Sequence, residues 1–412
     1  MNQGIANTIF SFFALFLKSL STLFLPFIVS NILGTDYFSD FSYFIILGSL
    51  VLVFCEYGSI YWLPNTIKKG DHDFKTQFSS DTFLEALNIR IIFFVLSAII
   101  CFILVAFKKL SFIDCILVLA IIQYSFFSLF YFSFRSYGFF KHELFLSLIV
   151  EILAFVVPIV CLLFFRDYNF FVLTFFGTRL VLIFFIFLYF RLTPLFSIED
   201  AVKTLSLRYS YFFQVAASSL VLYIDTFFVK YFYPSELYLH QGFLRLSILF
   251  CLFVPVANSI LLYYMRSNYL VSLKQYYIFL KKLLVFIVPI LLIYTVFSFM
   301  TFHLFVDFML GDKYSILHSY SFEFSILILL KYLSTIFGLN LTIIGFQNLR
   351  AQILFLVCIL GAILYYFGLK ELDFSNIFIL IVSFNAFIFL CYFISYLKYN
   401  VRSSLLSNKY VK

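Results

Sequence analysis

The chain has 412 residues, of which 64% are apolar and only 12% are charged, and its formal net charge is +8. Its mean hydropathy is +1.06. Soluble domains contain about 45–50% apolar and about 25% charged residues, so this composition excludes a water-soluble fold and predicts an integral membrane protein. One spanning helix takes about 20 residues. The apolar residues therefore fill about a dozen spans and leave none for a large extramembrane catalytic domain.

Hydropathy divides the chain into twelve predicted spanning helices. Their apolar runs are continuous rather than alternating, which is typical of helices. The predicted spans are residues 6–32, 41–64, 88–107, 112–134, 143–165, 168–190, 209–232, 241–265, 283–305, 315–346, 353–369 and 376–398. The tenth is too long for one straight crossing, so we expect it to be tilted, kinked or partly interfacial.

The distribution of positive charge predicts the orientation. With the N-terminus in the cytoplasm, eighteen Lys and Arg residues fall on the cytoplasmic side and six on the other. An excess of Lys and Arg marks the cytoplasmic side, so we expect both termini there, in a cytoplasmic (inner) membrane. The chain start has no basic segment and no small-residue cleavage site, so residues 6–32 are expected to be a span and not a removable signal peptide.

The polar stretch near the midpoint predicts two six-helix halves. We expect an N-terminal bundle at 1–192, a cytoplasmic linker at 193–208, and a C-terminal bundle with a short cytoplasmic tail at 209–412. A weak internal repeat supports this division: Gly34-Thr35-Asp36-Tyr37-Phe38 and Pro234-Ser235-Glu236-Leu237-Tyr238 occupy the same predicted external turn of each half. Parallel repeats of this kind are common in transporters.

Motifs of soluble enzymes do not occur in the sequence. It contains no GxxxxGK[ST], GxSxG or HExxH pattern, and its five histidines have no metal-ligand spacing. The seven cysteines lie singly in apolar runs, which predicts small packing residues rather than disulfides or a metal site. No basic cluster lies in a foldable soluble segment, so nucleic acid is not an expected partner. We expect no metal, no cofactor and no ATP hydrolysis.

Charged residues inside the predicted spans are the strongest functional candidates. Such charges are costly in a bilayer and usually face a bundle interior or a water-filled cavity. The candidates are Lys18, Glu56, Glu151, Arg179, Asp225, Lys230, Arg245, Glu323 and Lys331. Polar stripes at helical spacing run through the first, second, seventh and eighth spans and contain Lys18, Glu56, Asp225 and Arg245. Two stripes in each half predict one central polar cavity, although each charge is also compatible with a snorkelling side chain or a structural ion pair.

The signs of these charges predict two roles. Lys18, Arg179, Arg245 and Lys331 are expected to bind an anionic substrate. Asp225, Glu56 and Glu323 are expected to couple transport to an ion, because a carboxylate in low dielectric takes up a proton more readily than one in water. A structural ion pair is the alternative for Asp225.

Local sequence adds a family resemblance. The pairs Leu25-Pro26 and Leu33-Gly34 lie near the end of the first span. Glu56-Tyr57-Gly58 leads into Leu63-Pro64-Asn65-Thr66-Ile67-Lys68, and Gly311-Asp312-Lys313-Tyr314 precedes the tenth span. Together with the twelve-helix architecture, these segments resemble the lipid-linked oligosaccharide flippases of the multidrug/oligosaccharidyl-lipid/polysaccharide exporter superfamily. The expected fold class is an all-α, MATE-like integral membrane protein.

That resemblance implies a function. The chain would be an antiporter-type flippase, not an enzyme, and would move polyprenyl-pyrophosphate-linked oligosaccharide across the bilayer by alternating access. The implied pathway is polysaccharide biosynthesis (O-antigen, lipopolysaccharide), with a polysaccharide polymerase and chain-length proteins as partners. Multidrug exporters of the superfamily typically carry an acid in the first helix, whereas this chain has Lys18, which favours an anionic cargo.

Two enzyme classes are the alternatives. An O-antigen polymerase or a polyprenyl-dependent glycosyltransferase has a similar number of helices but carries its chemistry on a long external loop. The predicted external loops here contain about ten residues or fewer, and Asp36 and Asp40 lie on one that is too short for an active site.

Overall fold

A computed structural model describes residues 2–59, 62–63, 81–192, 198–252, 254, 265, 268–269, 271–344, 346–371 and 373–407. Every regular element in these ranges is an α-helix or a 3-10 helix, which confirms the predicted all-α fold class. Eleven of the described helices are long and apolar enough to cross a membrane. The eighth predicted span, 241–265, is not among these eleven, and its residues 253 and 255–264 lie outside the described part of the chain.

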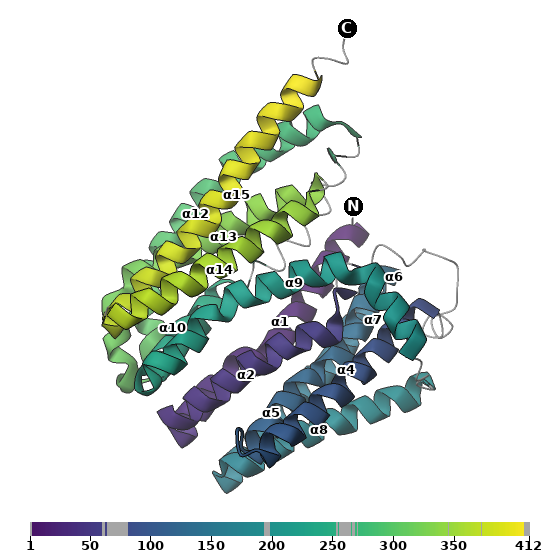
Figure 1. Ribbon diagram of the computed structural model, residues 1–412, viewed down its shortest axis with the longest axis vertical. Coiled ribbons are helices and arrows are strands. Elements are labelled where there is room, and N and C mark those ends of the chain that lie inside the picture. The colour runs from purple at the N-terminus through teal and green to yellow at the C-terminus, as the bar shows by residue number, and fades with distance from the viewer. Residues whose placement is uncertain are drawn as a thin grey trace. The chain divides into compact units, whose positions relative to one another are not determined.

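The chain forms two compact units, Met1–Ser219 and Leu220–Lys412 (Figure 1). The first contains α1 (Asn2–Leu33), α2 (Thr35–Glu56), α4 (Asp81–Ala106), α5 (Phe112–Ile122), α6 (Tyr124–Tyr137), α7 (Phe140–Phe165), α8 (Tyr168–Phe190) and the first part of α9 (Ile198–Phe232). The second contains the rest of α9, η2 (Pro234–Glu236), α10 (Leu237–Phe250), α12 (Leu273–Met309), η3 (Asp312–Tyr320), α13 (Ser321–Ile343), α14 (Gln347–Glu371), η4 (Phe374–Asn376) and α15 (Ile377–Ser407).

Two predicted spans are each divided into two helices in the structure. The fourth predicted span is divided into α5 and α6 at Gln123, and the tenth consists of the 3-10 segment η3 followed by α13. The second difference agrees with the expected kink. The predicted linker at 193–208 stays a prediction as a domain boundary, but its described residues from Ile198 onward are helical and belong to the first unit.

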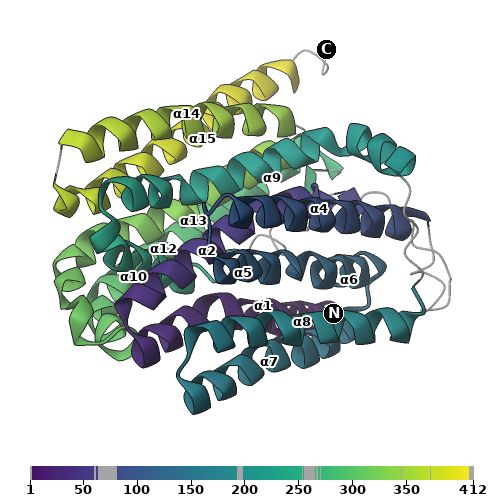
Figure 2. The same ribbon diagram turned by 60° about the horizontal axis from the view of Figure 1, so that its bottom comes forward.

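Each unit is held together by long helix–helix contacts. In the first unit α1 packs along α7, α2 along α5, and α7 and α5 along α8 (Figures 1 and 2). Leu25, Phe41, Ile121 and Phe171 are buried in one core cluster of this unit. In the second unit α13 packs against α15 and α12, and α14 packs against α15.

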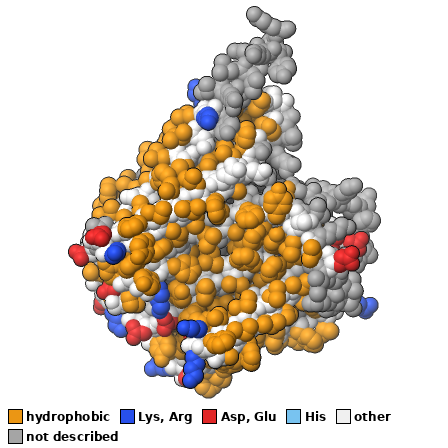
Figure 3. All heavy atoms as spheres, in the orientation of Figure 1, with side chains coloured by type: hydrophobic (Ala, Val, Ile, Leu, Met, Phe, Trp, Pro, Cys, Tyr) orange, Lys and Arg blue, Asp and Glu red, His pale blue; other side chains and the backbone are white. Residues whose placement is uncertain are grey.

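Large apolar side chains cover much of the outer surface. Phe102, Phe164 and Phe308 are 75%, 81% and 84% exposed, respectively. Hydrophobic side chains fill most of the face shown in Figure 3, and charged side chains gather towards its margins. Soluble monomers rarely expose contiguous apolar patches above a few hundred Å². A lipid environment is the solvent that suits this surface.

The repeated pentapeptides start equivalent helices. Gly34 has φ +103°, and α2 begins directly after it. The η2 turn begins at Pro234 and continues into α10. Asp36 and Glu236 lie in the first turns of α2 and η2, where a carboxylate is favoured by the helix dipole. The repeat thus marks the same local event, a tight turn into a new helix, in both units.

The Glu56-Tyr57-Gly58 segment packs against the first part of α9 within the first unit. Tyr57 and Gly58 end α2 with φ +41° and +71°, in the left-handed region. A Cβ atom on Gly58 would lie 2.6 Å from Cβ of Tyr211 and 2.9 Å from the backbone nitrogen of Phe212. The Tyr57 ring stacks on the Phe212 ring at 4.5 Å. Glycine is therefore required here both by the backbone turn and by the close approach of α9.

We expect Gly58→Ala to destabilise the protein more than Gly138→Ala. Both glycines have positive φ, but open space surrounds Gly138. The left-handed backbone alone costs about 1–3 kcal/mol for a non-glycine residue, and only Gly58 adds a backbone clash. Melting temperatures of the purified variants in detergent measure the difference. Equal melting temperatures would contradict the docking role.

Candidate functional site: buried charges in each unit

A polar stripe on α7 faces α1. Glu143, Ser147 and Glu151 follow one another at steps of four residues, and all three are buried. Residues at this spacing share one face of a helix. Because α1 packs along α7, this face meets the side of α1 that carries Lys18.

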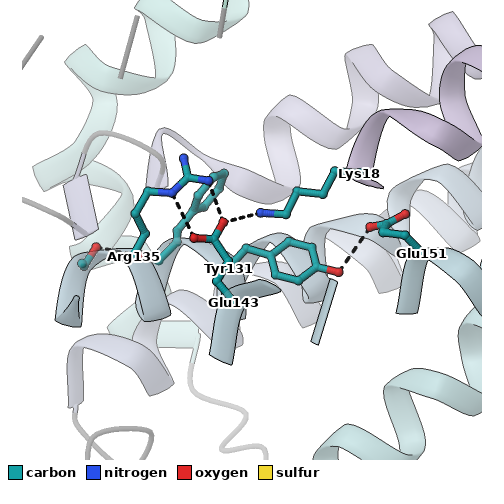
Figure 4. Close-up of polar contacts among 7 residues, drawn as sticks. Lys18, Tyr131, Arg135, Glu143 and Glu151 are labelled. Carbon is teal, nitrogen blue, oxygen red and sulfur yellow. Dashed lines mark hydrogen bonds and ion pairs between the residues drawn. The ribbon is translucent and has the colours of Figure 1, made fainter. Parts of the chain in front are cut away.

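Glu143 binds two cations (Figure 4). Its Oε1 atom lies 2.5 Å from Nζ of Lys18 and 2.6 Å from Nη2 of Arg135, and Nε of Arg135 donates to Oε2 at 3.3 Å. Glu143 is fully buried, whereas Arg135 is 25% exposed. One carboxylate shared by two cations leaves the cluster with one positive charge. The forked geometry of Arg135 is the strong form of this interaction.

Tyr131, on α6, connects this cluster with Glu151 on α7. Its hydroxyl donates to Oε1 of Glu151 at 3.2 Å, and Nζ of Lys18 lies 3.9 Å from the centre of its ring (Figure 4). Glu151 in turn interacts electrostatically with Arg179. Lys18, Glu143, Tyr131, Glu151 and Arg179 therefore form one continuous polar path through the apolar interior of the first unit.

Arg179 is held by the end of a helix. Its Nη1 atom donates to the carbonyl oxygen of Ala120 at 2.7 Å, and its guanidinium lies 4.0 Å from the centre of the Phe175 ring. Ala120 is in the last turn of α5, where helix carbonyls lack their usual amide partners. The break between α5 and α6 thus supplies an acceptor for a buried cation on α8.

Glu56 lies near a second buried arginine. It interacts electrostatically with Arg90, whose Nε donates to the carbonyl oxygen of Ser125 at 2.8 Å. Nη1 of Arg90 donates to the carbonyl oxygen of Ala86 at 2.9 Å and to Oγ of Ser59 at 3.2 Å. Arg90 is one of the eighteen positive residues counted on the cytoplasmic side, and that assignment is wrong: α4 begins at Asp81 and Arg90 is fully buried.

In the second unit Asp225 pairs with a histidine. Oδ2 of Asp225 lies 3.3 Å from Nε2 of His240, and Oδ1 accepts the backbone N–H of Thr226 at 2.8 Å. The side chain of Gln241 donates to Oγ1 of Thr226 at 3.2 Å. Asp225 and His240 are buried, so α9 and α10 are joined by a polar layer inside this unit.

Two predicted cations lie near this layer. Nζ of Lys331 donates to Oγ of Ser247 at 2.9 Å and interacts electrostatically with Asp225. Arg245 is buried and, like Asp225, interacts with Tyr223. Glu323, the third predicted coupling residue, is in the first turn of α13, where the helix dipole favours a carboxylate.

Several residues of these clusters were not identified as site residues from the sequence alone. Glu143 and Arg135 were placed at span ends, Tyr131 was not singled out, and His240 was treated as an isolated histidine. The spacing of Glu143, Ser147 and Glu151 was a usable signal, since three polar residues at steps of four are as regular as the four stripes that were recognised. The pairing of Asp225 with His240 had no comparable signal, because it joins two helices.

No protein-family model and no curated protein matches the chain. Among solved structures, it is similar to a MATE protein in a bent conformation, with a TM-score of 0.63, 12% identity, and 99% and 96% of the two chains covered. It is similar to a MOP superfamily transporter from Pyrococcus furiosus whose binding pocket is described as reversed in polarity, with a TM-score of 0.61, 13% identity, and 98% and 96% covered.

It is also similar to a multidrug resistance MATE family transporter in an outward-facing conformation, with a TM-score of 0.62, 13% identity, and 98% and 95% covered. The chain has the fold of the MATE transporters of the MOP superfamily. The likeness runs over nearly the whole of each chain and confirms the predicted MATE-like fold.

We expect Glu143→Gln to destabilise the protein strongly and Lys18→Met to do so less. Removing one partner of a buried ion pair costs about 3–5 kcal/mol because it leaves an uncompensated charge. Glu143→Gln leaves two such charges, whereas in Lys18→Met the Arg135 fork on Glu143 remains. Thermal unfolding in detergent measures both variants. A Lys18→Met variant that melts below Glu143→Gln would show that Lys18, not the carboxylate, organises the cluster.

Proposed function

We propose that the chain is a flippase that moves polyprenyl-pyrophosphate-linked oligosaccharide across the cytoplasmic membrane by ion-coupled alternating access. The similar solved structures are MATE or MOP superfamily proteins, which supports a transporter rather than an enzyme. The observation that favours an anionic cargo is the excess of cations in the clusters of both units. In the clusters described for the first unit the cations are Lys18, Arg90, Arg135 and Arg179, and the acids are Glu56, Glu143 and Glu151.

The second unit shows the same imbalance. Arg245 and Lys331 accompany the single carboxylate of Asp225. Surplus positive charge in a low-dielectric interior is costly, and an anion that binds there offsets the cost. A diphosphate fits this requirement, whereas a cationic drug adds to it. The Pyrococcus furiosus transporter, described as having a pocket of reversed polarity, supports the idea that this fold accepts different pocket charges.

The enzyme alternatives lose support from the short connections. Only Gly34 separates α1 from α2, and Arg166 and Asp167 separate α7 from α8. Asp36 and Asp40, which a glycosyltransferase would need on an external loop, lie within α2. In this proposal both termini remain cytoplasmic, and a polysaccharide polymerase and chain-length proteins act on the delivered cargo.

A deletion strain tests the proposed function against the polymerase alternative. Loss of a flippase leaves single lipid-linked units on the cytoplasmic side and no new surface glycan. Loss of a polymerase leaves surface glycans that are one unit long. Purified protein in liposomes that fails to move a fluorescent lipid-linked oligosaccharide would argue against the flippase directly.

Arg179 and Arg245 are expected to carry the interaction with the cargo. Substituting either by Ala should reduce transport at least about tenfold, which corresponds to about 1.4 kcal/mol. Arg245→Lys should recover little, because Lys lacks the planar fork that matches phosphate oxygens. Lys370→Ala is the control, since Lys370 is an exposed cation in the last turn of α14. Normal surface glycan in both Ala variants, at normal protein levels, would contradict the assignment.

Asp225 is expected to couple transport to protons, with His240 as its partner. Asp225→Asn should abolish the acceleration of transport by a pH gradient across liposomes, because the amide neither releases nor binds a proton. Glu236→Gln, at an exposed turn, should leave that acceleration unchanged. If Asp225→Asn transports at the wild-type rate with the same pH dependence, Asp225 is not the coupling site, and Glu56 or Glu323 becomes the next candidate.

A further inference from the structure

Two fully buried arginines in the first unit have hydrogen-bonding groups without acceptors. Arg90 on α4 and Arg208 on α9 are both 0% exposed. Among the described residues, Nη2 of Arg90 and all three side-chain nitrogens of Arg208 lack a hydrogen-bond partner. Buried donors are almost always satisfied by protein, water or a bound ion. Four unsatisfied nitrogens on two buried cations of the same unit are suited to an acceptor of negative charge.

The surroundings fix the two side chains in place. Arg90 is held on its other nitrogens by the carbonyl oxygens of Ala86 and Ser125 and by Oγ of Ser59. The guanidinium of Arg208 lies 3.2 Å from the centre of the Trp62 ring, as in a cation–π contact. The positions of both guanidinium groups are therefore set before any ligand arrives.

The charge of Arg208 is poorly compensated, whereas that of Arg90 is offset in part by Glu56. The described carboxylate nearest to Arg208 is that of Glu85, whose Oε2 atom lies 3.8 Å from Nη2. Glu85 is 38% exposed, and it also accepts a hydrogen bond from Thr204 at 3.3 Å. Burial lowers the pKa of the Arg208 guanidinium to about 9; the like charge of Arg90 adds to this effect and Glu85 opposes it.

The depth of this region suits a lipid headgroup. Arg208 lies one turn before Tyr211, where the apolar span of α9 begins. Trp62 and Tyr211 pack into the same apolar cluster, and Trp and Tyr are enriched at the interface between headgroups and acyl chains. A lipid phosphate and the Arg208 guanidinium would therefore lie at the same level of the bilayer.

We propose that Arg90 and Arg208 form a binding site for the phosphoryl group of a membrane lipid. Two guanidinium forks present donors in the planar arrangement that matches phosphate oxygens. The partly exposed Glu85 carboxylate occupies the edge of the site and is displaced when the phosphate binds. The ligand is either the phosphodiester of an acidic phospholipid or the diphosphate of a polyprenyl lipid. Only the second source rests on the proposed flippase function.

Lipid titration of the purified full-length protein in detergent tests this site. Phosphatidylglycerol, polyprenyl diphosphate and, as the zwitterionic comparison, phosphatidylcholine are added separately, and binding is followed by native mass spectrometry. Arg208→Gln and Arg90→Gln should weaken binding of the anionic lipid at least tenfold. Glu85→Gln should strengthen it, because the competing carboxylate is gone. Arg191→Gln removes an exposed cation at the end of α8 and should change nothing.

The response to each lipid identifies the source of the phosphate. Arginine-dependent binding of phosphatidylglycerol assigns a headgroup site and holds even if the protein moves no oligosaccharide. Arginine-dependent binding of polyprenyl diphosphate alone assigns a cargo site. The proposal is overturned if neither anionic lipid binds better than phosphatidylcholine, or if binding is the same in wild type, Arg208→Gln and Arg90→Gln.

Thermal unfolding separates this role from a structural one. In lipid-free detergent Arg208→Met should raise the melting temperature, because it removes a buried charge whose donors have no acceptor. The same variant should lose the further rise that the anionic lipid gives the wild type. A fall in the melting temperature of lipid-free Arg208→Met, with an unchanged response to lipid, would show that Arg208 serves packing alone and would refute the site.

Discussion

A charge inside an apolar helix bundle has to be compensated within the same bundle, and the interior of the first unit is built around this constraint. Glu143 shows it most directly, because it is fully buried and accepts both Lys18 and Arg135. The polar stripe of α7 determines which face turns inward, and α1 follows because it carries the counter-ion. Helix pairing in an apolar solvent has no hydrophobic driving force, so such contacts help to define which faces of α1 and α7 meet.

The same constraint connects structure with function. The clusters are not neutral. Glu143 pairs with two cations, so one positive charge is left without a counter-charge in that cluster. Arg179 is held by a helix-end carbonyl rather than by an acid alone. A purely structural network would gain from one more carboxylate. In the proposed function, the surplus of fixed cations is offset by an anion when the cargo binds. This is the physical reason for proposing a diphosphate-bearing cargo over a cationic one.

Sequence patterns predicted what depends on a single helix and missed what depends on two. The positions of α1, α7, α8 and α12 follow from apolar runs, and the kinked tenth span follows from its length. Lys18, Asp225 and Arg245 were recognised because polar residues repeat along one helix. The partners Glu143 and His240 were missed since only helix packing brings them to Lys18 and Asp225. Arg90 was counted with the cytoplasmic charges because it falls in the first turn of the predicted span 88–107, whereas α4 begins at Asp81 and Arg90 is buried well inside it.

The burial of Arg90 and Arg208 also bears on the orientation of the chain. Both were counted among the eighteen positive residues assigned to the cytoplasmic side, yet both lie inside helices of the first unit. Without them sixteen remain against six, so the charge bias still favours cytoplasmic termini. Among the residues of this set whose side chains the structure describes, only these two arginines are fully buried. A cation that serves only to retain a loop on one side of a membrane needs no burial. A cation that binds a lipid phosphate benefits from burial, because the attraction between the two charges is stronger in low dielectric. Their burial therefore points to recognition rather than to topology.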